Sequence, residues 1–158
     1  ASFIPTRLLS LGHGMNATNT NIGGWNGSAM REFCNGRVYD AFPIEWKSII
    51  KKVQIPASAG NRTSDIVYSK DYVYLPSYAE VFATPESEDP YTSEGKIITF
   101  FNTDADRVKT MNGAASIWYL RSAEVSYNTY FRSVSAQGNM NGYVVSSRSL
   151  GICPCISI

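Results

Sequence analysis

The residue that most readily carries out acid and base chemistry, histidine, occurs once in this sequence. His13 lies between Gly12 and Gly14, with no serine or cysteine nucleophile beside it. The chain contains neither the G-x-S-x-G motif of α/β-hydrolases nor the H-E-x-x-H motif of zinc proteases. Sequence distance alone does not forbid a triad assembled in space. We nevertheless predict that His13 is not catalytic.

Two short acidic clusters could offer carboxylates to a reaction or to a metal. Glu86, Glu88 and Asp89 could supply the carboxylate pair of a glycosidase. Their surroundings are polar and contain proline, which favours solvated carboxylates in an exposed loop over residues 84–95. Asp104 and Asp106 could bind calcium, but the central Gly and distal Glu of an EF-hand are absent. We therefore expect no metal site, no cofactor and no enzyme activity.

The three cysteines are Cys34, Cys153 and Cys155. An odd number, with two of them separated only by Pro154, does not suggest the disulfide framework of a small secreted domain. Alternation along a strand would place Cys153 and Cys155 on the same face, which is a poor geometry for a mutual disulfide. A zinc site would need further Cys or His residues. We expect buried, reduced thiols.

Composition limits the class of protein further. With 158 residues the chain has the length of one domain, which we place at residues 1–158. A net charge of +1 without a run of basic residues argues against a nucleic-acid partner. No apolar run reaches the roughly 20 residues of a membrane span, and the first residues lack the apolar region of a signal peptide. Only 17% of the residues are charged, so Tyr, Ser, Asn and Thr must supply much of the polar surface.

The hydrophobic pattern predicts an α+β domain with two main helices packed on a mixed, mostly antiparallel sheet with long loops. The helices are expected at 28–34, with Ser28 as N-cap, and at 43–53, with Trp46 in the apolar stripe. Ser77 and Glu80 have capping-box spacing. Strands are expected at 4–11, 66–75 (broken near 70–71), 97–101, 117–122, 130–136, 142–146 and 152–158, the last at an edge or bulge because of Pro154.

Several segments together resemble a family of bacterial and prophage domains. The matching residues are Gly23-Gly24-Trp25, Ser28-x-Met30-Arg31, Tyr74-Leu75-Pro76-Ser77-x-x-Glu80, Trp118-Tyr119-Leu120-Arg121-Ser122 and Gly151-Ile152-x-Pro154. That family resembles C-type-lectin-like proteins and is similar to the variable proteins of diversity-generating retroelements. The resemblance covers nearly the whole chain in the same order, and it implies a C-type-lectin-like fold.

This sequence departs from the family pattern at three positions. Cys153 replaces an Arg before the terminal Pro, Tyr119 replaces a Trp, and Cys34 replaces a Leu. The motifs for calcium-dependent sugar binding in C-type lectins are absent, so such binding is not implied. A related scaffold occurs in formylglycine-generating enzymes, which use a cysteine pair. That analogy would require Cys153 and Cys155 to lie in an accessible cleft.

The segment 124–148 has the composition of a binding surface. It is dense in Tyr, Ser, Asn and Gly and includes two Arg, the residues that supply aromatic anchors and adaptable hydrogen bonds in paratopes. A polar hairpin rich in turn-forming residues is the alternative. In the retroelement proteins the corresponding stretch is the displayed binding surface. The predicted ligand-binding residues are Tyr127, Asn128, Tyr130, Arg132, Asn139, Asn141 and Tyr143.

Other residues of the matching segments are assigned structural roles. We expect Trp25, Trp46, Trp118 and Leu120 in the core. Arg31 and Arg121 are expected to satisfy buried carboxylates or carbonyls.

These observations lead to two hypotheses of different classes. The first is a non-catalytic binding domain on a phage tail or bacterial surface protein, which recognises a cell-surface protein or glycan. The second is a structural or oligomerisation domain of a tail fibre or surface assembly, a trimer in the case of a fibre. Both place the protein on a virion tail or at the bacterial cell surface, without membrane insertion.

Overall fold

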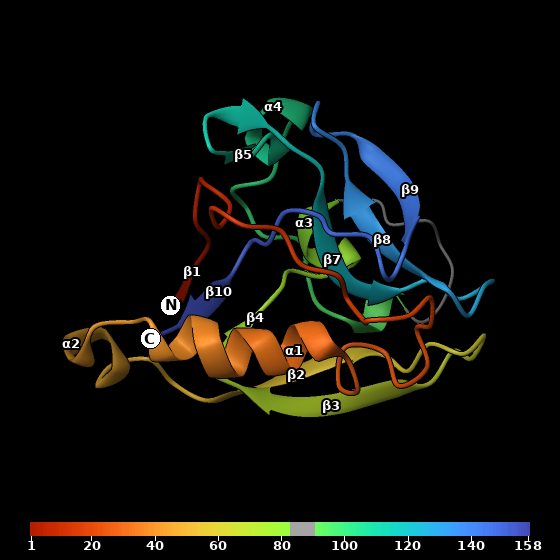
Figure 1. The fold of residues 1–158 in the computed structure, drawn as a ribbon, viewed down its shortest axis with the longest axis horizontal. Coiled ribbons are helices and arrows are strands. Elements are labelled where there is room, and N and C mark those ends of the chain that lie inside the picture. Colours follow the sequence, from red (N-terminus) through yellow and green to blue (C-terminus); the bar gives the residue numbers. More distant parts are fainter. Residues whose placement is uncertain (83–90) are drawn as a thin grey trace.

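The computed structural model describes residues 1–82 and 91–158, apart from the side chain of Asn141 (Figure 1). Its described strands form small antiparallel sheets. One has the order β1-β10-β4, with bounds Ser2–Phe3, Cys155–Ser157 and Val73–Tyr74. Two are two-stranded: β2 (Val53–Ser58) with β3 (Ile66–Asp71), and β5 (Thr110–Met111) with β6 (Ala114–Ala115). The fourth has the order β7-β8-β9, with bounds Trp118–Ala123, Tyr130–Val134 and Met140–Val145.

The described helices are short. Helix α1 (Ala29–Phe33) runs directly into a π-helical turn, η1 (Cys34–Val38), so that the two form one cylinder across β2 and β3 in Figure 1. Helices α2 (Ile44–Lys47), α3 (Tyr78–Val81) and α4 (Asp104–Arg107) have one turn each, and η2 (Tyr91–Ser93) is a 3-10 turn. The predicted N-cap at Ser28 and the capping box of Ser77 with Glu80 are confirmed.

The prediction of an α+β fold with two main helices is wrong. The described residues form more strand than helix, in several small antiparallel sheets, and the expected helix 43–53 ends at Lys47. The Lys51 N–H donates to Ser157 O at 2.8 Å, which draws the chain toward β10 before β2 begins at Val53. The apolar stripe that suggested one helix therefore belongs to two elements. Trp46, expected in the core, is 41% exposed.

Other element boundaries also differ from the predictions. The opening strand is Ser2–Phe3, not 4–11, and residues 97–101 form no strand. Strand β10 lies between β1 and β4, with Pro154 before its first residue, so it is not an edge strand. Of the predicted exposed loop 84–95, residues 91–95 carry the buried side chains of Tyr91 and Glu94. Glu86, Glu88 and Asp89 lie outside the described residues.

The apolar core connects the sheets with α1 and α3. Trp25, Trp118 and Leu120 are fully buried in it, as predicted. All three cysteines are free and buried, which confirms that their thiols are interior groups. Burial raises the pKa of the Cys34 thiol above its ordinary range. Cys153 and Cys155 are 0% and 1% exposed, whereas the analogy with formylglycine-generating enzymes requires them in an accessible cleft.

Arg121 and Arg31 bind carboxylates and carbonyls of distant segments, as predicted. Arg121 has no exposed side-chain surface; Nη1 lies 2.6 Å and Nη2 3.1 Å from the two oxygens of Glu80. It also donates to the carbonyls of Pro56, Leu75 and Glu94. Arg31 Nε lies 2.7 Å from Oδ1 of the buried Asp71. These bidentate and charge-assisted bonds fix segments 27 to 65 residues apart.

Candidate recognition surface

Three tyrosine rings gather at the ends of β8 and β9 and form what we term the tyrosine cluster: Tyr127, Tyr130 and Tyr143. The ring centroids of Tyr130 and Tyr143 are 4.8 Å apart, and each lies 5.5 Å from that of Tyr127. Tyr127 and Tyr143 are each 44% exposed, whereas Tyr130 is half-buried. The arrangement is a packed aromatic surface with one side open to solvent.

Sheet register explains why these rings meet. Tyr143 on β9 pairs with Arg132 on β8, and Tyr130 lies two residues from Arg132 on the same face of the strand. The intervening Phe131 pairs with Val144 on the opposite face, and both are buried. The two-residue alternation therefore directs the tyrosines to one face of the sheet and the apolar pair to the core.

Arg132 pairs with Tyr143 across β8 and β9, but it is buried, at 5% exposure. Its Nε lies 2.9 Å from Oε2 of the buried Glu124 and 3.3 Å from the hydroxyl of Tyr91. Its guanidinium carbon lies 5.1 and 5.0 Å from the ring centroids of Tyr78 and Tyr91. The prediction that Arg132 belongs to an exposed binding set is wrong in this respect, because these partners draw it inward. Burial also raises the pKa of the Tyr91 hydroxyl, so this group stays protonated.

The loop that carries Tyr127 is held by Asn21, a fully buried residue from the N-terminal part of the chain. Its side-chain amide donates to the carbonyls of Glu124 at 3.0 Å, Tyr127 at 2.7 Å and Tyr130 at 2.9 Å. Its backbone N–H donates to Asn128 O at 2.8 Å. One side chain therefore fixes both ends and the middle of the loop, which preorganises it for binding.

A close backbone approach positions Asn21 itself. Gly60 has a φ of +68°, and a Cβ at this position would overlap the carbonyl of Asn21. The neighbouring Asn61 N–H donates to the Asn21 side-chain oxygen at 2.9 Å. Glycine is needed here both for the left-handed backbone and for space.

The remaining predicted site residues divide as follows. Asn128 and Asn139 are exposed, in the loop before β8 and in the turn before β9. The side chain of Asn141 lies outside the described set. Met140, which sequence reasoning did not select, is 42% exposed, and its sulfur accepts from the Tyr78 hydroxyl.

Sequence reasoning also missed Asn21 and Tyr91. Asn21 occurs in a stretch rich in Gly, Asn and Thr that looks like an ordinary turn. Its side-chain partners lie 40 to 109 residues away, so no local signal reports them. A buried tyrosine such as Tyr91, close to the acidic stretch, gives no pattern that distinguishes it from an exposed one.

The chemistry available at this surface is that of contact and hydrogen bonding. The three rings contact one another and present tyrosine hydroxyls, whereas the buried Arg132 and Glu124 are paired with each other. Over the described residues, no group of three or more His, Cys, Asp or Glu side chains is arranged to bind a metal. Within the same part of the chain, every helix is too short to cross a bilayer.

Comparison with known proteins gives one family. No curated protein and no solved structure matches the chain. Residues 6–158 match the family described as a domain of unknown function, DUF6273. Since this match covers nearly all of the sequence, the chain belongs to the DUF6273 family.

Proposed function

We propose that this protein is a non-catalytic binding domain whose tyrosine cluster recognises a cell-surface protein or glycan. The observation that carries the proposal is the preorganised set of three tyrosines, two of them 44% exposed, one of which pairs across the sheet with the buried Arg132. Aromatic residues on a rigid support are typical binding hot spots, because they bury a large area at low entropic cost.

Two further features support the proposal. The loop of residues 124–130 is fixed by Asn21, so binding would order few additional groups. Asn128, which follows Tyr127 in the loop before β8, exposes an amide that can adapt its hydrogen bonds to a partner. The resemblance to retroelement variable proteins, in which the corresponding segment is displayed, leads us to place the domain on a phage tail or bacterial surface protein.

Binding measurements with matched tyrosine variants test this function. The wild type, the double variant Tyr127→Ala with Tyr143→Ala, and the control Tyr68→Ala are applied to a printed array of bacterial surface glycans and to a panel of purified bacterial surface proteins. Tyr68 lies on β3 and is 60% exposed, so it matches the mutated residues in type and exposure.

The expected result is saturable binding of the wild type to at least one ligand. The double variant should lose roughly 30-fold or more in affinity, the ratio that corresponds to about 2 kcal/mol. Tyr68→Ala should bind as the wild type does. Equal binding by all three proteins, or no saturable binding to either set, would contradict the proposal.

A second candidate, an assembly domain, is favoured by a different observation. Around α2, the apolar side chains of Phe3, Ile44, Trp46 and Ile49 are 45%, 74%, 41% and 49% exposed. The rings of Phe3 and Trp46 are 6.3 Å apart, so part of this set is contiguous. Exposed apolar patches commonly mark contacts between proteins.

Sedimentation velocity distinguishes this candidate. If α2 makes a subunit contact, the wild type sediments as an oligomer, a trimer in the case of a tail fibre, and Ile44→Ser with Trp46→Ser sediments as a monomer. A monomeric wild type across the accessible concentration range would contradict the assembly role. It would have no bearing on the proposed binding by the tyrosine cluster.

A further inference from the structure

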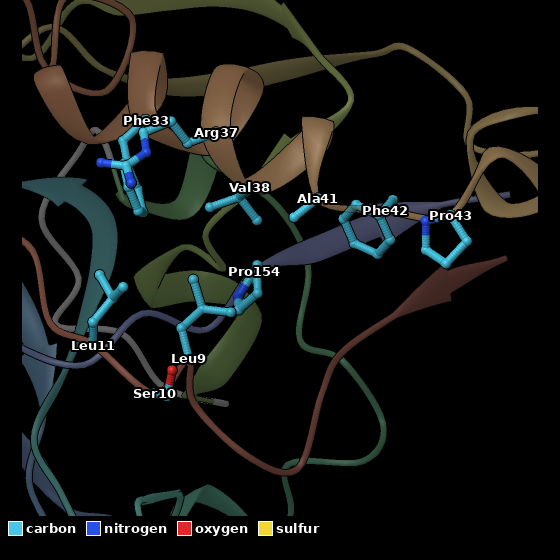
Figure 2. A pocket seen from close by; sticks show the side chains of 10 residues that line it. All are labelled: Leu9, Ser10, Leu11, Phe33, Arg37, Val38, Ala41, Phe42, Pro43 and Pro154. Atoms are coloured by element: carbon cyan, nitrogen blue, oxygen red, sulfur yellow. The ribbon is translucent and has the colours of Figure 1, made fainter.

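An apolar groove lies between the helical cylinder and the N-terminal segment (Figure 2). Its volume is about 380 Å³. No residue of β7, β8 or β9 lines it. The size falls within the range of small-molecule pockets, about 300–1,000 Å³.

Figure 2 shows how the lining residues are arranged. Phe33 and Arg37 lie near one end, whereas Phe42 and Pro43 lie at the other. Between them the helical wall presents apolar side chains, and the opposite wall comes from the N-terminal segment and the stretch before β10. The remaining lining residues are Leu9, Ser10, Leu11, Val38, Ala41 and Pro154.

The walls of this groove are fixed by backbone hydrogen bonds. On the N-terminal side, Leu8 N donates to Thr110 O at 2.9 Å and Leu9 N donates to Ile152 O at 3.1 Å. On the helical side, Arg37 and Val38 lie in the π-helical turn η1. Such turns are rare and are frequently found at functional sites. The groove is therefore preformed and does not depend on a loop closing over it.

Arg37 is the cation of the groove. In the part of the chain that the structure describes, its guanidinium has no hydrogen-bond or ion-pair partner; it lies 6.0 Å from the centroid of the Phe33 ring. Asp40, one helical turn further on, instead lies 3.9 Å from Lys47 Nζ. Phe33 is in turn stacked on His13, with ring centroids 4.5 Å apart, which fixes the ring beside Arg37.

We propose that this groove binds a small molecule that has an apolar chain or ring and a terminal carboxylate. The apolar part lies along Leu9, Val38 and Phe42, and the carboxylate meets Arg37. A guanidinium presents two parallel N–H donors to a carboxylate, which gives both orientation and affinity. One cation balances one negative charge, so a monoanionic carboxylate fits better than a dianionic phosphate. This site is independent of the proposed tyrosine surface.

Isothermal titration with decanoate and with decan-1-ol, both below the concentrations at which they aggregate, tests the site. The two probes share a ten-carbon chain and differ in the charged head. Four proteins are compared: the wild type, Arg37→Gln, Ala41→Trp, which fills the groove from an exposed position, and the control Arg62→Gln, an exposed arginine elsewhere. Circular dichroism confirms that each is folded.

The expected results distinguish the contribution of the ligand's carboxylate charge to affinity from the contribution of the groove's shape. The wild type binds one decanoate, about tenfold or more tightly than decan-1-ol. Arg37→Gln loses that preference and leaves decan-1-ol binding unchanged, Ala41→Trp loses both ligands, and Arg62→Gln behaves as the wild type. Absence of saturable binding to the wild type, full decanoate affinity in Arg37→Gln, or full affinity for both probes in Ala41→Trp would each overturn the proposal.

Discussion

Arg121 and Arg132 are both buried arginines that contact a carboxylate, but they stabilise different parts of the molecule. Arg121 reaches Glu80 and three carbonyls from separate segments, with no side-chain surface exposed. Arg132 reaches Glu124 and Tyr91, and it pairs across the sheet with Tyr143, which is 44% exposed. The first arrangement holds the framework together, whereas the second supports one loop and the surface above it.

This difference suggests that stability and binding are separable in this domain. A change in the Arg121 network should alter the stability of the whole fold, whereas a change in the tyrosine cluster should alter what the domain contacts. The four predictions below follow from that contrast, in order of decreasing effect.

Replacing Arg121 with Met should reduce the free energy of unfolding by about 3–5 kcal/mol, since it leaves the Glu80 carboxylate and three carbonyls without their buried partner. Urea unfolding followed by circular dichroism measures the change. The control Arg148→Met, at an exposed position, should stay within about 0.5 kcal/mol of the wild type. A similar small loss in both variants would show that the Arg121 network does not hold the framework.

The Glu94 carboxyl makes the framework sensitive to pH. Burial raises its pKa from 4.5 to about 7, so the folded protein binds more protons than the unfolded chain between these values. The free energy of unfolding should therefore fall by about 3 kcal/mol as the pH rises from 4.5 to above 7. Unfolding curves at several pH values measure this slope, and Glu94→Gln should flatten it. A slope unchanged in Glu94→Gln would assign the effect to other groups.

Replacing Asn21 with Ala should reduce the free energy of unfolding by about 2 kcal/mol, because several buried carbonyls and the Asn61 N–H lose a partner. Any ligand of the tyrosine cluster should also bind more weakly, since the loop must then be ordered on binding. Asn128→Ala, which changes an exposed amide in the same loop, is the control for stability. Equal stability of the two variants would contradict the role of Asn21.

The smallest effect on stability is expected for Tyr127→Ala with Tyr143→Ala. Both rings are 44% exposed, so the free energy of unfolding should change by no more than about 1 kcal/mol. Thermal and urea unfolding provide the measurement. If the double variant unfolds or loses several kcal/mol, the tyrosines belong to the core and the contrast with Arg121 disappears.

Local sequence signals predicted the local features of the fold well. The cap at Ser28 and the capping box at Ser77 depend on side chains within three residues of the helix start, and both are present. Alternating and aromatic residues located β7 and β8 to within a few residues. Motif positions also placed Arg31 and Arg121 against buried groups.

Structural features that depend on contacts between residues far apart in the sequence could not be predicted from local sequence signals. Trp46 has helical spacing with Ile49 and Ile50, but the bond between Lys51 and Ser157 ends the helical path before one apolar face can form. Arg132 occurs in a polar segment, and its burial depends on the rings of Tyr78 and Tyr91 and on the carboxylate of Glu124. The tyrosine composition of the segment predicted a surface without predicting the support beneath it.

Strand β7 has a consequence for how the domain opens. All six of its residues are buried, and its backbone is bonded on both sides: to β8, and through Tyr119 N to Gly151 O and Arg121 N to Pro76 O. Amide protons in such a strand can exchange with solvent only when the neighbouring segments separate together. Residues 118–123 should therefore exchange only through the slowest, global opening of the protein. The rate of deuterium uptake there would then report global unfolding of the domain.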